Sequence, residues 1–355
     1  MESTIKHLLN EVIHPETGEG LLAGDMVERI AADEEKITVS LRFRKVRDPF
    51  ALKIKNRVQA LLLEHFPAYE GRITVLIKEG EAQKTAPAQE KRTTTGAIAY
   101  AVAVSSGKGG VGKSTVTANL AVTLRNMGYR VGILDADIYG PSQPRMFGVE
   151  GYLPEAEHDE KSGADYILPA ETMGLKLMSI GFFIKADDAL MWRGAMATNA
   201  LKQLIHQTKW GTLDFLLIDM PPGTGDIHLS LISELKLSGA VIVSTPQQVA
   251  VADVVRGVEM FRHPQVNVPV AGIVENMAWF TPAELPDNRY YLFGRGGARR
   301  YAEQKGVPFL GEIPIIQSVM EGSDAGTPAV LEDSRVEKYY RDICERIVEN
   351  VVKGC

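Results

Sequence analysis

The sequence predicts an α/β protein in which a mostly parallel sheet is flanked by helices and preceded by a small α+β domain. Three observations predict this. Short runs that are apolar throughout recur between helical segments in the second part of the chain. A polar stretch without periodic apolar positions interrupts the chain before them. The length of 355 residues suits more than one unit, since a domain takes about 150 residues.

The first predicted unit, an α+β domain, covers residues 1–80. Helical spacing of apolar side chains appears at 4–11 and again at 50–65, and strict alternation predicts strands at 36–43 and 72–78. The polar sequence EGEAQKTAPAQEKRTTTG follows, and within it residues 81–96 are predicted to form a linker.

The second predicted unit covers residues 97–355 and ends in a C-terminal helix. Its apolar runs, separated by helices, are typical of strands covered on both faces in a parallel sheet. Ligands of such sheets bind beyond the carboxyl ends of the strands, so we expect the site there. The predicted strands are 98–105, 130–135, 175–180, 215–219, 240–244, 270–274 and 309–310.

Composition limits the protein class. The chain is 45% hydrophobic and 24% charged, which is typical of a globular protein, and its net charge of −6 does not suit a protein that coats polyanions. Two cysteines cannot build a disulfide framework and fit a reducing compartment. The N-terminal sequence MESTIKHLLNEV is too charged for a signal peptide, and no apolar run approaches the roughly 20 residues of a membrane helix. We therefore expect a cytoplasmic protein without a membrane partner.

The most specific motif is SSGKGGVGKST at residues 105–115, which satisfies G-x-x-x-x-G-K-[ST] between an apolar strand and a helix. Glycines let backbone N–H groups converge on phosphates, and a helix N-terminus adds partial positive charge. We expect Lys113 to reach the β- and γ-phosphates with a catalytic role, and Ser114 to bind Mg²⁺. The predicted ATP-binding residues of the loop are Gly107, Lys108, Gly109, Gly110, Val111, Gly112, Lys113, Ser114 and Thr115.

Three aspartates follow predicted strands and complete a candidate magnesium site. Asp135 and Asp137 in LDADIYGPS alternate along an extended segment and so share a face toward the phosphates. Asp219 ends the buried apolar run in DFLLIDMPPGTGD. A carboxylate at the end of a buried strand is typical of a residue that holds Mg²⁺ through a water molecule. Capping or turn formation by these aspartates is the structural alternative.

Two further polar residues have open interpretations. Lys108 lies inside the glycine-rich loop and is either a solvated cation or a charge offered to a partner subunit's phosphates, as an arginine finger is. Asn276 follows the strand at 270–274; its amide suits the edge of adenine, but asparagine after a strand is often a turn residue.

These motifs resemble a known family. GKGGVGKST resembles the deviant Walker motif of septum-site, plasmid-partition and nitrogenase-iron-protein ATPases, and together with DADIYGPS, MWRGAMATNAL, LFGRGGARRYAEQ and GEIPI it resembles the Mrp/NBP35 family of P-loop ATPases. The resemblance implies a homodimer that sandwiches nucleotide, with Lys108 acting in trans. It further implies that Asp137 activates the attacking water, that Asp135 supports the metal, and that Asn276 contacts the base. The N-terminal segment IHPETGEGLLAGDMVERI is similar to the MIP18-like domain of iron–sulfur assembly, which implies an apoprotein or regulatory partner there.

The sequence departs from this family at its cluster site. Members that carry iron–sulfur clusters between subunits have a C-x-x-C after ENM, whereas this chain has ENMAWFTPAELPDNRYYLFG, and its RDPFAL segment also lacks a cysteine. Cys344 shares an apolar helical stripe, which favours a core position, and Cys355 ends the chain. We therefore expect ATP and Mg²⁺ as cofactors, and no iron–sulfur ligands are assigned.

The loss of these cysteines resembles the SalA branch of the family, in which the ATP switch regulates genes. A row of cations suits DNA phosphates, although a solvated helix face is the favoured interpretation of such a row. The row comprises Arg289, Arg295, Arg299, Arg300 and Lys305. The leading hypothesis is a Mg²⁺-dependent, ATP-hydrolysing dimeric switch, by family an iron–sulfur carrier or assembly factor. An ATP-dependent DNA-binding regulator is the alternative, and a scaffold that recruits partners through residues 1–80 is a third hypothesis.

Overall fold

The computed structural model describes residues 2–15, 18–32, 36–43, 50–69, 71–78, 97–160, 163–183 and 195–353. The chain folds into two compact units, Met1–Lys91 and Arg92–Cys355, which are considered separately here. The predicted linker at 81–96 and Cys355 lie outside the described residues, as do the first half of RDPFAL and the start of MWRGAMATNAL.

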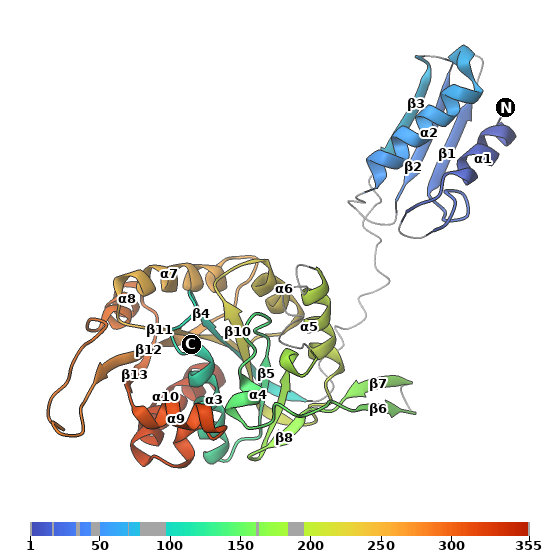
Figure 1. Ribbon diagram of the computed structural model, residues 1–355. Helices are drawn as coiled ribbons and strands as arrows, with labels where there is room; N and C mark the ends of the chain where they lie inside the picture. The colour runs from blue at the N-terminus through green and yellow to red at the C-terminus, as the bar shows by residue number, and fades with distance from the viewer. Residues whose placement is uncertain are drawn as a thin grey trace. The chain divides into compact units, whose positions relative to one another are not determined.

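The N-terminal unit packs two helices on a three-stranded sheet (Figure 1). Its sheet has the order β1-β2-β3, with β1 antiparallel to β2 and β2 parallel to β3. Apolar side chains from the helices and from β2 fill one core, because the helical and alternating patterns each leave one apolar face. The elements are α1 (Glu2–Glu11), β1 (Val27–Ala32), β2 (Ile37–Arg42), α2 (Ala51–His65), a short 3₁₀ turn (Pro67–Tyr69) and β3 (Ile73–Lys78).

The second unit is built on an eight-stranded sheet with the order β13-β12-β11-β4-β10-β5-β9-β8. All neighbouring strands run parallel except β8, which is antiparallel to β9. A separate antiparallel hairpin joins β6 to β7. The strands are β4 (Ile98–Ser106), β5 (Val131–Asp135), β6 (Ala156–Asp159), β7 (Ala164–Ile167), β8 (Ala170–Thr172), β9 (Leu175–Ser179), β10 (Leu213–Pro222), β11 (Gly239–Ser244), β12 (Val270–Phe280) and β13 (Phe309–Ile315).

Helices cover both faces of this sheet, which confirms the predicted fold class (Figure 1). Helices α3 and α10 bury apolar side chains against one face, and α5 to α8 do so against the other. The central strands are apolar throughout because both faces are covered. The helices are α3 (Lys113–Asn126), α4 (Gln143–Met146), α5 (Ala195–Gln207), α6 (Asp226–Glu234), α7 (Gln248–Arg262), α8 (Gly297–Lys305), α9 (Gln317–Ala325) and α10 (Ser334–Val352), with 3₁₀ turns at Ile180–Phe182 and Ala329–Leu331.

The strand register brings the expected site residues to one edge. Asp219 of β10 lies opposite Val104 of β4 on one side and opposite Asp135 of β5 on the other. The glycine-rich loop follows β4, so it lies beside both carboxylates at the carboxyl edge, where parallel sheets bind ligands. Within the described residues, no helix is both long and apolar enough to span a bilayer.

Candidate nucleotide-binding site

The glycine-rich loop connects β4 to α3 and has the backbone geometry of a phosphate cradle. Gly110 and Gly112 have φ angles of +80° and +81°, a region that residues with a Cβ rarely adopt. Within the loop, the Ser106 hydroxyl donates to the Lys108 carbonyl at 2.9 Å, and the side chain of Val111 is buried. Helix α3 begins at Lys113, so its first N–H groups point into the loop, where an anion would satisfy them.

Lys113 is the central charge of the site. Its ammonium is buried and forms an ion pair with Asp219, lies 3.7 Å from Asp137 Oδ2 and is 3.1 Å from the Ser114 hydroxyl. Burial alone would lower the pKa of Lys113, but the charge of Asp219, followed by those of Asp137 and Asp135, raises it above the usual value. The lysine is therefore held as a cation among carboxylates.

Asp135 and Asp219 are completely buried at the ends of adjacent strands. Asp135 Oδ2 accepts hydrogen bonds from the Ser179 hydroxyl at 2.9 Å and from the backbone N–H of Gln143 at 3.1 Å. Burial, and then the charge of Asp219, raise the pKa of Asp135 to about 7. The carboxylates of Asp135 and Asp219 therefore repel each other unless a further positive charge lies beside them.

Asp137 follows β5 and lies at the opening of the site. Its backbone N–H donates to Asp135 Oδ1 at 3.2 Å, and its side chain is 11% exposed. Its Oδ1 atom is buried and has no hydrogen-bond partner among the described residues. Burial raises the pKa of Asp137, whereas Lys113 opposes that change. A buried carboxylate oxygen without a partner suits a water molecule, a cation or a protonated group.

Gln143 of α4 is a site residue that the sequence analysis missed. Its side-chain Nε2 donates to Asp219 Oδ2 at 2.8 Å and to the Ser114 carbonyl at 3.0 Å, and its side-chain oxygen is buried without a partner. Gln143 thus connects the phosphate loop to the carboxylates of both neighbouring strands. Gln143 belongs to no recognised motif. Its position directly after DADIYGPS is the one sequence feature that points to a role in the site.

Lys108 contacts another part of the same chain. Its ammonium donates to Gln247 Oε1 at 3.3 Å and is partly exposed. A Cβ on the preceding Gly107 would lie 2.4 Å from the Asp253 backbone, so the loop entrance and α7 are in close contact. The structure therefore places Lys108 at the surface of the phosphate loop, against the segment that follows β11.

Asn276 lies beside the phosphate loop. Its side-chain amide donates to the Val111 carbonyl at 2.9 Å, and a Cβ on Gly112 would lie 2.4 Å from the same nitrogen. The strand expected to end at residue 274 is longer than predicted: β12 continues to Phe280, with an irregularity at Met277, whose φ is +56°. Asn276 is thus a residue within a strand that holds the loop in place.

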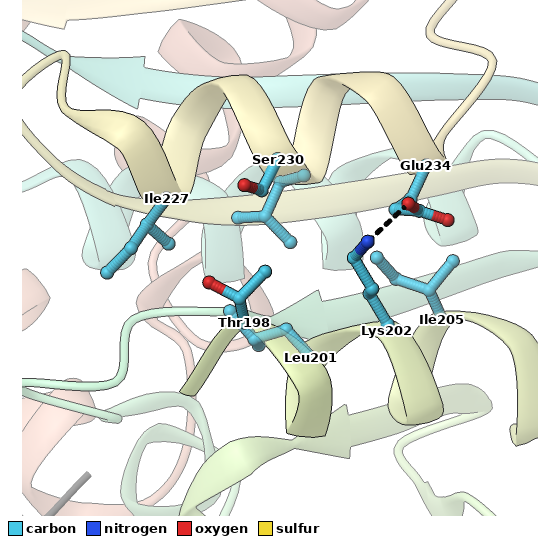
Figure 2. Close-up of a pocket in the computed structure, with 8 residues that line it drawn as sticks. Thr198, Leu201, Lys202, Ile205, Ile227, Ser230 and Glu234 are labelled. Atoms are coloured by element: carbon cyan, nitrogen blue, oxygen red, sulfur yellow. Dashed lines mark ion pairs between the residues drawn. The ribbon is translucent and has the colours of Figure 1, made fainter. Parts of the chain in front are cut away.

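The segment after Asp219 leads into α6. His228 of α6 is buried, and its Nε2 lies 2.8 Å from the Pro221 carbonyl. Figure 2 shows α6 facing α5, with Lys202 paired to Glu234 at 2.8 Å. The crevice between these helices has no room for a water molecule. On this side α6 therefore packs against α5 without room for a ligand, whereas its other side borders, together with α7, a cavity of about 660 Å³.

The cysteines do not form a metal site within the described residues. Cys344 of α10 is completely buried, as predicted, and its Sγ is 3.6 Å from the Leu120 carbonyl. Burial raises the pKa of the Cys344 thiol far above its usual range. In the part of the chain that the structure describes, no group of three or more His, Cys, Asp or Glu side chains is placed to hold a metal ion.

The parallel sheet, the loop after β4 and the buried lysine–carboxylate cluster define a P-loop NTPase. The model of the ParA family described as NUBPL iron-transfer P-loop NTPase matches residues 97–349. The chain belongs to this family, and its resemblance to the Mrp/NBP35 ATPases is confirmed.

Relatives with known names agree with this assignment. An iron–sulfur cluster carrier protein of Aquifex aeolicus is 47% identical over 261 residues, which are 72% of this chain and 69% of the relative. One of Synechocystis sp. is 38% identical over 346 residues, 97% of this chain and 96% of the relative. An Archaeoglobus fulgidus nucleotide-binding protein solved with ADP has a TM-score of 0.58 at 40% identity and covers 68% of this chain and 92% of its own.

Proposed function

We propose that the chain is a magnesium-dependent ATPase whose turnover drives a dimeric switch. The observation that carries this proposal is the cluster of Lys113 with three buried or nearly buried carboxylates beside the phosphate loop. When all four groups are ionised, the site carries a net charge of −2, because three aspartates (Asp135, Asp137 and Asp219) face one lysine. A divalent cation that arrives with the nucleotide would remove that excess. Because the described side chains are not placed to hold an ion by themselves, phosphate oxygens and water would complete its ligands, and the unpartnered Asp137 oxygen could accept a hydrogen bond from such a water.

Each residue then has a defined role in ATP hydrolysis. The N–H groups at the start of α3 and the Lys113 ammonium bind the β- and γ-phosphates. Ser114, Asp135 and Asp219 would hold Mg²⁺, which neutralises charge on those phosphates when it is bound. Asp137 orients the attacking water and accepts its proton, and because burial raises the pKa of this carboxyl it is a stronger base than an exposed aspartate. ATP and water become ADP and phosphate.

The dimer is the second part of the proposal. Two copies meet through their nucleotide faces, and Lys108 leaves Gln247 to reach the partner's phosphates. Lys108 is partly exposed, and among the described residues its ammonium donates one hydrogen bond, to an uncharged amide. Both observations support this, because little is lost when that bond breaks. Light scattering with Mg-ATP, Mg-ADP and no nucleotide tests it. A mass that doubles with ATP alone supports the switch, and a constant mass contradicts it.

The third part of the proposal concerns cargo. Relatives named iron–sulfur cluster carriers suggest that this ATPase serves cluster assembly, with the N-terminal unit recruiting the apoprotein or another partner. The described residues do not fit a cluster, because the one cysteine among them is buried in the core behind α3. We therefore propose that the chain supplies the ATP-driven step rather than a complete ligand set of its own.

Anaerobic reconstitution with iron and sulfide tests this division of roles. The expected result is a colourless protein without stoichiometric iron that still hydrolyses ATP. A brown dimer with about four thiolate-bound irons would show that the chain carries a cluster itself. Deletion of residues 1–90 followed by a pull-down tests recruitment, which should be lost while ATP hydrolysis remains.

A further inference from the structure

A second pocket lies on the nucleotide-binding unit, where the end of β12, the start of α8 and β13 meet. Its volume is about 300 Å³. Four arginines line it, together with two aromatic side chains: Arg289, Arg295, Arg299, Arg300, Trp279 and Tyr291. The sequence predicts a row of five cations along a loop and helix, and the structure gathers four of them, all except Lys305, around one concave site.

Aromatic rings and backbone oxygens hold three of these arginines in place. The Arg289 guanidinium lies 4.4 Å from the centre of the Trp279 ring, and that of Arg295 lies 4.9 Å from the Tyr291 ring. Arg300 donates to the Arg295 carbonyl at 2.6 Å. Cation–π contacts and carbonyl groups orient a guanidinium without cancelling its charge.

The carboxylates in the surroundings leave most of this charge uncompensated. Glu312 pairs with Arg299 at 3.1 Å. Among the described residues, no carboxylate pairs with Arg289, Arg295 or Arg300. Within the described part of the chain, the carboxylate of the nearby Glu275 binds backbone groups and not an arginine side chain. It accepts hydrogen bonds from the N–H groups of Gly296 and Ala298 at 3.1 and 2.7 Å. Three like charges therefore converge on one pocket.

We propose that this pocket binds a phosphorylated small molecule through its phosphate group. Guanidinium forks match phosphate oxygens in pairs, and a phosphate monoester or diphosphate concentrates at least two negative charges in one group. Three arginines without a carboxylate partner among the described residues surround about 300 Å³, which fits such a compact dianion better than the evenly spaced phosphates of a duplex, which need a long open face. The site is separate from the phosphate loop in sequence and lining residues.

Calorimetry with inorganic pyrophosphate as the probe tests the pocket. The full-length protein is first saturated with Mg-ADP, so that the phosphate loop is filled and its own occupancy is measured separately. Pyrophosphate should then bind saturably, at one site per chain. Arg289→Gln and Arg295→Gln should each weaken this binding by about tenfold or more, because each removes a charge-assisted hydrogen-bond donor.

Arg57→Gln is the matched control, since it removes an equal charge from an exposed position on α2. It should leave pyrophosphate affinity unchanged, and unchanged Mg-ADP affinity in all three variants shows that the fold is intact. The proposal is overturned if pyrophosphate does not bind, if the control weakens it equally, or if malonate of similar charge binds as tightly. Duplex DNA that binds through Arg289 and Arg295 without competition from pyrophosphate would also overturn it.

Discussion

Gly112→Ala tests how the phosphate loop is held in its conformation. The glycine has a φ of +81°, and a side chain in this left-handed region costs about 1–2 kcal/mol. The new Cβ would also lie 2.4 Å from the Asn276 amide nitrogen. Asn276 must then move and lose its 2.9 Å hydrogen bond to Val111, which adds about 1 kcal/mol. We expect the free energy of unfolding to fall by about 2–3 kcal/mol in urea titrations without nucleotide.

Two further variants separate these two costs. Gly128 has a φ of +95° with open space around its would-be Cβ, so Gly128→Ala should show the conformational cost alone. In an Asn276→Ala background the collision is absent, and Gly112→Ala should there cost about 1 kcal/mol less than in the natural sequence. Equal losses in both backgrounds would refute the contact between Asn276 and the loop.

Three other predictions concern catalysis and the buried thiol. Asp137→Asn should still bind Mg-ATP but release phosphate at least about 100-fold more slowly, because the water loses its proton acceptor; unchanged turnover would remove Asp137 from the chemistry. Lys108→Ala should keep nucleotide affinity and lose dimer-dependent turnover, and normal phosphate release would rule out its action in trans. In a Cys355→Ser variant, iodoacetamide should not label Cys344 until urea unfolds the chain, because burial raises the pKa of the thiol. Rapid labelling of the native protein, detected by mass spectrometry, would contradict the core position.

Much of the second unit could be predicted from local sequence patterns. The strands β4, β5 and β11 are apolar on both faces, so continuous apolar runs mark them. The phosphate loop was equally visible, because its glycines and lysine are required at fixed spacing by the backbone geometry itself. The gathering of Asp135 and Asp219 followed from parallel strands ending at one edge.

Other features depend on tertiary contacts that no local pattern reports. Strand β1 and the β6–β7 hairpin are exposed or half-buried throughout, so neither has an apolar run. The sequence predicts a strand that ends at residue 274, before residues 275–277. Pairing with β13 extends β12 beyond these residues, although Met277 has a positive φ. Gln143 gains its role because the short helix α4 brings it between Ser114 and Asp219.

Titration of the purified protein with Mg-ATP in a calorimeter tests the central claim most directly. We predict saturable heat with one nucleotide per chain, and its loss in Lys113→Ala, since the cation that faces the phosphates is then missing. A well-folded natural protein that gives no heat with Mg-ATP, or a Lys113→Ala protein that binds it equally well, would contradict the assignment of this lysine–carboxylate cluster to nucleotide.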